Sequence, residues 1–227
     1  MRVRRAPADA GDGGDAGPID PCTGAIFCDH FERDAVQGSW TSVYTDNGGT
    51  AALDTTTFTS ATHSLLLHVP VSPDAGDPHA QLSSASYDNV THARVSFSMK
   101  LAAADRNMSL IRLQLTQSAN EAEVFDLFML PTKLVVDEEL AGNSATYFNY
   151  DVTGFVPNVW QRWTMELDAT GAATVGVVSI DGTEVIRTTL NDTFKRGSFN
   201  ILLGAFYAPS GPANDIFFDD LSITILP

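Results

Sequence analysis

The two ends of the region expected to fold constrain this chain most. In residues 25–33, and again in residues 215–224, apolar residues alternate with other residues, which is typical of a half-buried β-strand. In each segment an aspartate, Asp29 or Asp219, falls on the apolar side of the alternation. The apolar neighbours two positions away are Phe27 and Phe31 for the first aspartate, and Phe217 and Leu221 for the second. Because a carboxylate facing a core must be paired, hydrogen-bonded or bound to a metal, the pattern predicts an all-β domain whose terminal strands meet.

Most of the chain between these ends has the pattern of an antiparallel β protein. Apolar and polar residues alternate over 94–101 and 110–116, and a nearly continuous apolar run covers 124–130. The remaining expected strands are 63–71, 133–138, 146–150, 160–168, 174–180, 183–190, 199–207 and 216–225. Asp181-Gly182 suits a two-residue type I′ hairpin, whose central residues both need positive φ. About a dozen strands without intervening helices predict two packed antiparallel sheets, a jelly-roll β-sandwich.

Composition excludes several classes of partner. The 227 residues include 13 Lys and Arg against 28 Asp and Glu, a net charge of −15. This excess repels phosphate backbones and anionic lipid, so we expect no nucleic-acid partner. No apolar run is long enough to span a membrane. The basic start, residues 1–5, resembles that of a signal peptide, although no apolar segment follows it.

The first part of the chain is expected to be a tail. Residues 1–21 are rich in Asp, Gly, Ala and Pro and form a predicted disordered linker, and residues 22–227 form the single folded domain. Cys22 and Cys28 lie just before the first strand. They predict a small disulfide loop, which would indicate an oxidising compartment; two reduced thiols are the alternative.

Several short motifs together resemble those of concanavalin A-like lectin/glucanase jelly rolls. They are the opening Phe-x-Asp-x-Phe-Glu of residues 27–32, the run of residues 160–167, and the closing Phe-Asp-Asp-Leu of residues 218–221. The chain is most similar to laminin-G-like exported bacterial proteins, including those with an Asp/Gly-rich tail after a lipoprotein anchor. The resemblance implies an extracellular or cell-envelope location. It also implies a function related to glycans, since the superfamily includes lectins, glycan-binding modules and glycosidases.

The resemblance also implies a metal site at the joined ends. Similar jelly rolls often hold a structural Ca²⁺ between the first and last strands, and the matching positions here are Asp29, Glu32 and Asp219. Calcium takes six to eight oxygen ligands, readily from carboxylates. The alternative is that the two aspartates accept hydrogen bonds from backbone amides or pair with Arg33.

A second implied site is catalytic. Glu121, Glu123 and Asp126 resemble the Glu-x-Asp-x-x-Glu of laminarinase-type glycosidases, with the Asp and the last Glu exchanged. Retaining hydrolysis needs two carboxyl groups about 5 Å apart. Glu121 and Asp126 point to opposite faces of a regular strand, so a bulge would be needed to bring them together. A strand edge with solvated glutamates is the alternative.

A third candidate is a sugar-binding groove. Arg112 and Asp126 interrupt strongly apolar strands, and if those strands pair the two side chains can form a cross-strand ion pair. Expected neighbours on that face are Gln114, Thr116, Arg94, Ser96 and Lys100, with aromatic walls from Tyr147, Tyr150, Trp160 and Tyr207. A simply solvated polar face is the alternative.

The sequence therefore favours a non-catalytic glycan-binding or envelope-associated module, stabilised by calcium. The alternatives are a laminarinase-type glycoside hydrolase, and a structural or protein-interaction domain without a sugar site.

Overall fold

A computed structural model describes residues 20–60, 62–71, 77–118, 121–140, 146–191 and 196–227. Apart from its last two residues, the predicted tail of residues 1–21 lies outside these ranges. All regular elements within the described residues are β-strands. Among them is no helix that could cross a lipid bilayer.

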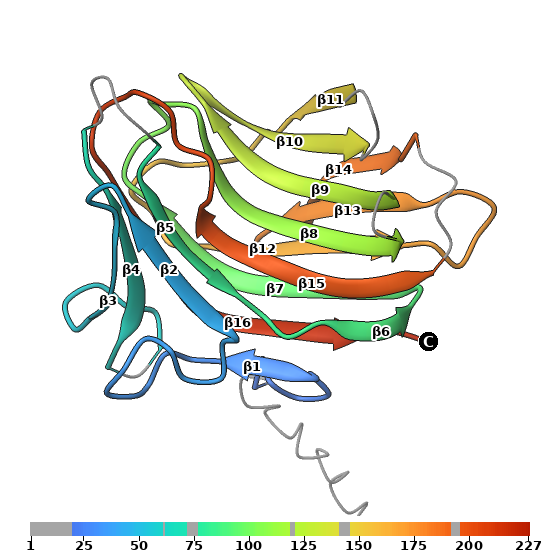
Figure 1. The fold of residues 1–227 in the computed structure, drawn as a ribbon, viewed down its shortest axis with the longest axis horizontal. Coiled ribbons are helices and arrows are strands. Elements are labelled where there is room, and N and C mark those ends of the chain that lie inside the picture. The colour runs from blue at the N-terminus through green and yellow to red at the C-terminus, as the bar shows by residue number, and fades with distance from the viewer. Residues whose placement is uncertain (1–19, 61, 72–76, 119–120, 141–145, 192–195) are drawn as a thin grey trace, which may run out of the picture.

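The strands form two antiparallel sheets that pack face to face (Figure 1). We call them sheet A and sheet B. In spatial order sheet A contains β14 (Thr183–Thr189), β13 (Val175–Ile180), β12 (Gln161–Asp168), β7 (His92–Leu101), β16 (Asn214–Ile225), β4 (Ser64–Val69) and β3 (Thr50–Asp54), with β1 (Phe27–Asp29) also paired to β16. Sheet B contains β11 (Thr146–Asp151), β10 (Lys133–Leu140), β9 (Glu121–Leu130), β8 (Met108–Ser118), β15 (Gly197–Ala205), β5 (His79–Ser83) and β2 (Ser42–Asp46), with β6 (Tyr87–Val90) also paired to β15.

Alternation along each strand builds the core between the sheets. On β12 every second residue, including Trp163 and Met165, is buried, and the residues between them are half-buried on the outer face. The same rule gives sheet B a buried inner face, for example Leu113 of β8 and Phe125 of β9. A period of two is what a sheet with one packed face requires, and the expected β-sandwich is confirmed.

The terminal strands meet as the sequence predicts. β1 pairs with β16 in a register that places Phe27 opposite Ile223 and Asp29 opposite Leu221. The predicted type I′ hairpin is also present, since Asp181 and Gly182 have φ values of 50° and 77° between β13 and β14.

Four strands were not expected from the sequence: β2, β3, β5 and β6. β6 (Tyr-Asp-Asn-Val) carries little apolar alternation, whereas β5 does alternate, with Ala80 and Leu82 buried, but over only five residues. β2 and β3 are the last strands on one side of their sheets, where backbone pairing on a single side suffices to hold a polar segment.

Candidate functional site

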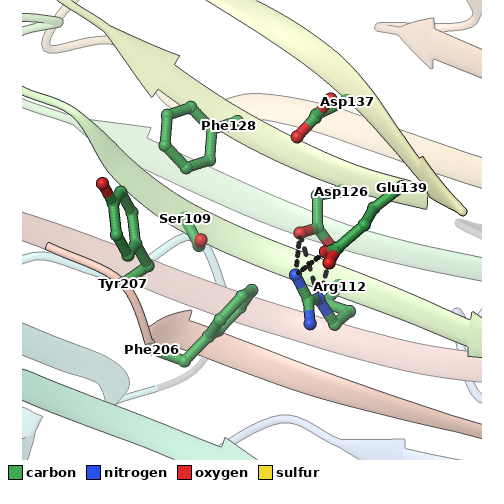
Figure 2. A pocket seen from close by; sticks show the side chains of 8 residues that line it. All are labelled: Ser109, Arg112, Asp126, Phe128, Asp137, Glu139, Phe206 and Tyr207. Atoms are coloured by element: carbon green, nitrogen blue, oxygen red, sulfur yellow. Dashed lines mark hydrogen bonds and ion pairs between the residues drawn. The ribbon is translucent and has the colours of Figure 1, made fainter. Parts of the chain in front are cut away.

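A cavity of about 540 Å³ lies on the outer face of sheet B, away from the core (Figure 2). Strands β8, β9 and β10 supply its floor, and the segment after β15 supplies one wall. Its lining consists of Ser109, Arg112, Asp126, Phe128, Asp137, Glu139, Phe206 and Tyr207.

Strand register brings the charged groups together. Arg112 of β8 lies opposite Asp126 of β9, and Asp126 lies opposite Asp137 of β10. The three therefore form one row across three strands. Their sequence neighbours face the core, as for the fully buried Leu113 and Leu127, so the alternation that builds the core also points this row outward.

Arg112 and Asp126 form a two-pronged ion pair. Nε of Arg112 lies 2.9 Å from Oδ1 and 3.0 Å from Oδ2 of Asp126, and its second amino group donates to Oδ2 at 2.7 Å. The same amino group donates to Glu139 at 3.1 Å. Asp126 is only 3% exposed. Because this two-pronged ion pair is largely shielded from solvent, it fixes the Arg112 and Asp126 side chains in one geometry.

The carboxyl groups of this row have raised pKa values. Burial raises the pKa of Asp126 against the opposing effect of Arg112, and the result is about 7. Burial also raises the pKa of Asp137 to about 6, with a further contribution from the charge of Glu139. Oδ1 of Asp137 is buried and accepts no hydrogen bond from the residues that the structure describes. The site thus holds one buried acceptor without a hydrogen-bond donor among the described residues and two carboxyl groups whose pKa values lie near neutral pH.

Aromatic rings form the wall beside the charged row. The rings of Phe128 and Tyr207 are 5.9 Å apart, and the Arg112 guanidinium lies 4.8 Å from the centroid of the Phe206 ring. The backbone N–H of Ser109 donates to the Tyr207 carbonyl at 2.9 Å, which fixes this wall to β8. Tyr207 is 47% exposed, so its ring is open to solvent.

The structure unites some of the residues expected in a groove and separates others. Arg112, Asp126 and Tyr207 line the cavity, and Gln114 follows on the same face of β8. Tyr150 of β11 instead donates to Glu138, which is fully buried on the inner face of β10. Tyr147 also belongs to β11, in register with Glu139.

Three other expected neighbours are in the wrong place for this groove. Arg94, Ser96 and Lys100 belong to β7 in sheet A, so the prediction that they share a face with Arg112 is wrong. Trp160 lies beside Phe217 of the same sheet.

The sequence analysis missed five cavity residues, namely Ser109, Phe128, Asp137, Glu139 and Phe206. A signal for Asp137 was available. Leu130 pairs with Lys133 across a two-residue turn, and that turn sets Asp126 opposite Asp137. The run of three acidic residues at 137–139 hides this alternation, because Glu138 faces inward between two outward carboxylates.

The catalytic motif expected at Glu121, Glu123 and Asp126 lies at the start and middle of β9. The register of β9 with β10 is continuous from Glu123 to Leu130. The two irregularities between β8 and β9 each insert an extra residue into β8. The bulge that would bring Glu121 and Asp126 onto one face is therefore not found in β9, and the catalytic role stays a prediction.

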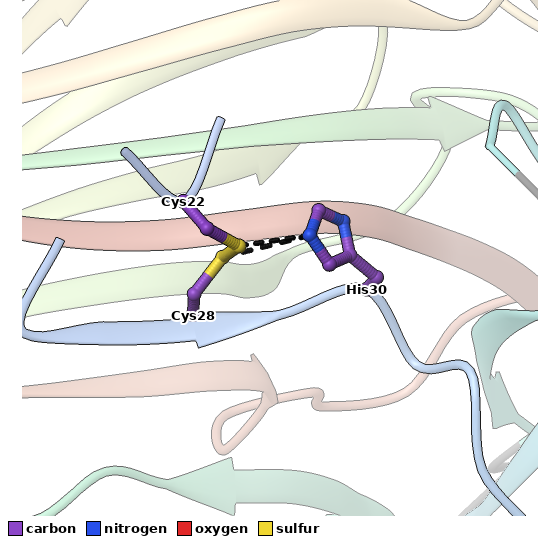
Figure 3. Close-up of side chains that lie close together, drawn as sticks. All are labelled: Cys22, Cys28 and His30. Carbon is purple, nitrogen blue, oxygen red and sulfur yellow. Dashed lines mark hydrogen bonds between the residues drawn. A yellow bond between two sulfur atoms is a disulfide. The ribbon is translucent and has the colours of Figure 1, made fainter. Parts of the chain in front are cut away.

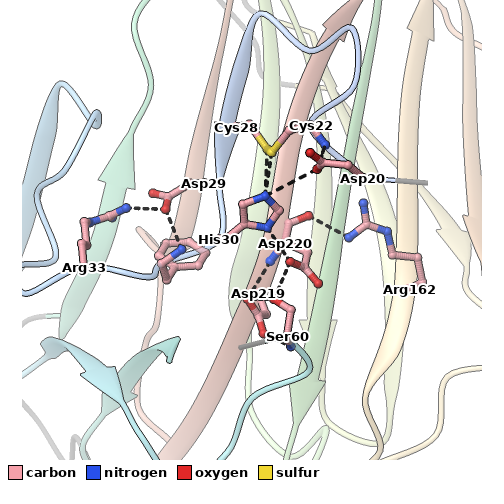
Figure 4. Close-up of a disulfide and its surroundings, with 11 residues drawn as sticks. Asp20, Cys22, Cys28, Asp29, His30, Arg33, Ser60, Arg162, Asp219 and Asp220 are labelled. Carbon is pink, nitrogen blue, oxygen red and sulfur yellow. Dashed lines mark hydrogen bonds and ion pairs between the residues drawn. A yellow bond between two sulfur atoms is a disulfide. The ribbon is translucent and has the colours of Figure 1, made fainter. Parts of the chain in front are cut away.

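Protein donors surround Asp29 and Asp219, two of the carboxylates expected to bind calcium (Figure 4). Asp29 accepts hydrogen bonds from the backbone of Phe31 at 2.7 Å, from Trp40 Nε1 at 2.6 Å and from Arg33. One oxygen of Asp219 accepts from the backbone N–H groups of Thr59 at 2.8 Å and Ser60 at 3.1 Å.

The third expected ligand, Glu32, accepts hydrogen bonds from the backbone of Thr62 and His63, both at 2.9 Å. These contacts, and others from the Thr62 and His63 side chains, outweigh the effect of burial and lower the pKa of Glu32 to about 2. The contacts of Asp29 and Asp219 are those of the alternative without metal, and Glu32 likewise accepts hydrogen bonds from protein groups. Calcium at the joined ends stays a prediction.

Cys22 and Cys28 form a disulfide next to His30 (Figure 3). His30 Nε2 lies 2.8 Å from the Cys22 sulfur, and Nδ1 lies 2.7 Å from a carboxylate oxygen of Asp220 on β16. Among the described residues, one group of possible metal ligands lies close together, and it consists of Cys22, Cys28 and His30. Sulfurs joined in a disulfide are not thiolates, so this group does not constitute a zinc site.

Comparison with known proteins identifies the fold. No family model and no curated protein sequence matches the chain. Among solved structures, an endo-β-1,4-glucuronan lyase from the fungus Trichoderma reesei superposes with a TM-score of 0.70 at 14% identity, covering 89% of this chain and 96% of that one.

Two further structures extend this comparison. The cellulose-induced protein Cip1 gives a TM-score of 0.65 at 15% identity, covering 87% of this chain and 96% of that one. The laminarinase catalytic domain of Thermotoga maritima gives 0.60 at 10%, covering 89% and 98%. At these identities the likeness concerns the fold alone, and it confirms the expected jelly-roll β-sandwich.

Proposed function

We propose that the protein binds a polysaccharide in the cavity on the outer face of sheet B, without cleaving it. The observation that carries this proposal is the combination of a fixed Arg112–Asp126 pair with an aromatic wall at Phe206 and Tyr207. Sugars present hydroxyl groups at their edges and C–H groups on their faces. Paired charged groups suit the hydroxyls and open aromatic rings suit the C–H faces, so the cavity matches both surfaces.

The charge of the cavity favours an uncharged polysaccharide as the ligand. Asp126, Asp137 and Glu139 face a single cation, Arg112. Acidic groups therefore outnumber cations in this lining, and their excess disfavours the carboxylates of a uronic acid polymer. We therefore propose a neutral glucan as the ligand class. Two of the similar structures, the laminarinase and the glucuronan lyase, are enzymes that act on polysaccharides, which supports a glycan ligand in general terms.

Hydrolysis is the second candidate, and one observation favours it. Asp126 and Asp137 lie opposite each other with pKa values of about 7 and about 6, which is the range in which a carboxyl group serves as an acid at neutral pH. Against it, both Asp126 oxygens accept hydrogen bonds from Arg112, so this group is not free to donate a proton to a glycosidic oxygen.

A location outside the cytoplasm belongs to the same proposal. Disulfides such as Cys22–Cys28 persist in oxidising compartments, which supports an extracellular or cell-envelope protein.

Binding is tested by calorimetry with soluble β-1,3-glucan, mixed-linkage β-glucan and glucuronan. We expect a neutral glucan to bind and Tyr207→Ala to weaken it about tenfold, which corresponds to about 1.4 kcal/mol. Tyr44→Ala is the matched control, because Tyr44 is 45% exposed on β2, away from the cavity lining. Equal effects of the two substitutions would remove the cavity from the proposal.

Hydrolysis is tested on the same samples by measuring new reducing ends. Their release by the wild-type protein, and its loss in Asp137→Asn, would replace the binding function with the enzymatic one. Failure of every glycan to bind or react would favour a protein-interaction domain.

A further inference from the structure

A second hollow lies on the outer face of sheet B, at the other end of β8. Its volume is about 440 Å³. Thr116 and Gln117 of β8, Ser198 of β15, Asp88 of β6 and Arg196 line it. We call it the distal hollow and the Arg112 cavity the proximal one.

A strip of polar side chains joins the two hollows. From Arg112 the outward positions of β8 are Gln114 and Thr116, and the Gln114 amide donates to the Thr116 hydroxyl at 3.2 Å. On the neighbouring strand Asn200 lies opposite Gln114, and Ser198 lies opposite Thr116. Hydroxyl and amide groups thus continue without an apolar interruption along β8 from one hollow to the other.

The chemistry of the distal hollow suits the same kind of ligand. The Ser198 hydroxyl donates to Asp88, and Arg196 adds one positive charge to balance this carboxylate. The remaining groups are amides and hydroxyls, which can donate to and accept from sugar hydroxyls. The distal hollow therefore lacks the excess negative charge of the proximal one.

The distance between the hollows sets the size of the ligand. Ser109 at the proximal end and Gln117 at the distal end are eight residues apart on β8. Because β8 contains two bulges, the regular strand β9 covers the span opposite Ser109 to Thr116 in six residue steps, from Phe128 to Ala122, which is about 20 Å at about 3.3 Å per residue. A single sugar cannot reach both hollows, whereas an oligosaccharide of several units can.

We propose that the distal hollow is a second subsite of the same groove, so that the ligand is the interior of a long neutral glucan lying along β8. This inference rests on the proposed function. It adds a direction for the glucan, which lies parallel to β8 and β15 rather than across the strands. It also excludes a site that recognises only the end of a glucan.

The experiment measures Kd by calorimetry for neutral gluco-oligosaccharides of increasing length. For the wild-type protein we expect affinity to rise at least tenfold from a disaccharide to an oligosaccharide that spans β8. The combined substitution Gln117→Ala and Arg196→Ala should abolish that gain and leave disaccharide binding unchanged. Arg187→Ala is the control, because Arg187 lies exposed on β14 of sheet A; melting curves of all variants verify that each is folded.

Each other result overturns the inference in a recognisable way. Affinity that does not grow with length, while Tyr207→Ala still weakens binding, removes the distal subsite and leaves the proposed function intact. If Tyr44→Ala loses the gain in affinity with oligosaccharide length, and the combined Gln117→Ala and Arg196→Ala variant keeps it, the glucan crosses the strands toward β2. Binding of no oligosaccharide and no polymer at all removes both proposals.

Discussion

The guanidinium of Arg106 donates to the carbonyl of Ala208 at 2.9 Å, and Ala208 directly follows Tyr207 in the chain. The same guanidinium donates to the carbonyls of Pro70, Pro209 and Pro212 at 3.1, 2.6 and 2.8 Å. Arg106 is 1% exposed. One buried cation therefore gathers four backbone carbonyls and holds the aromatic wall of the proximal cavity in place.

We expect Arg106→Met to destabilise the protein by about 3 kcal/mol or more, because four hydrogen bonds from a charged group are lost and each contributes about 1.5–3 kcal/mol. Arg187→Met, at an exposed ion pair, should change the free energy of unfolding by less than about 0.5 kcal/mol. Urea unfolding of both variants measures the difference. Similar losses in the two would show that the four carbonyls find other donors.

The Arg106 contacts also show where sequence-based prediction stops. The strands of 94–101, 110–116 and 160–168 were predictable because their apolar alternation is the direct consequence of one packed face. The Arg112–Asp126 pair was predictable for the same reason, since two charges interrupt two apolar strands that pair.

Tyr207 was expected in the aromatic wall, but Phe128 and Phe206 were not, and the position of the wall was not predictable in this way. Its position depends on carbonyls gathered by Arg106 from Pro70 and from residues 208–212, segments far apart in the sequence. No periodic pattern of apolar residues in the local sequence indicates such a contact. The acidic run 137–139 is a different case. Its side chains alternate between the outer and inner faces of β10, but three consecutive acidic residues give no apolar–polar pattern that would indicate this.

Calcium binding at the joined ends can be tested by melting curves with calcium and with a chelator. A site filled at a hundredfold excess over Kd would add about 2.7 kcal/mol, or about 5–10 °C for a domain of this size. The hydrogen bonds that Asp29 and Asp219 already accept favour an unchanged melting temperature, and this is the result we expect. A rise of several degrees would instead support the metal site predicted from the sequence.

The Cys22–Cys28 disulfide closes a short loop that ties the start of the domain to β1. For a loop of this length the chain-entropy model gives about 2 kcal/mol of stabilisation. We expect the double substitution Cys22→Ser and Cys28→Ser to lower the free energy of unfolding by about that amount in urea. Reductant should lower wild-type stability equally and leave the double variant unchanged; an effect of reductant on the double variant would point to another cause.

The raised pKa of Asp126 predicts a pH-dependent stability. Its folded-state pKa of about 7 lies above the ordinary value of 3.8, so over this range the folded protein holds a proton that the unfolded chain has lost. This contribution to stability is fully present below about pH 4 and is lost as the pH rises to about 7. Asp137, with a pKa of about 6, acts in the same direction. Glu32, with a pKa of about 2, has the opposite sign, and its contribution is lost only below about pH 4.5.

Urea unfolding at about pH 5 and about pH 8 therefore isolates the groups of the cavity from Glu32. Between these conditions we expect wild-type stability to fall by about 1 kcal/mol or more relative to Asp126→Asn, whose amide cannot ionise. Asp151→Asn should follow the wild type, because Asp151 is exposed and paired only with Lys133 among the described residues. Parallel profiles for the wild type and Asp126→Asn would mean that Arg112 keeps Asp126 ionised throughout this range, with its pKa at or below the ordinary value.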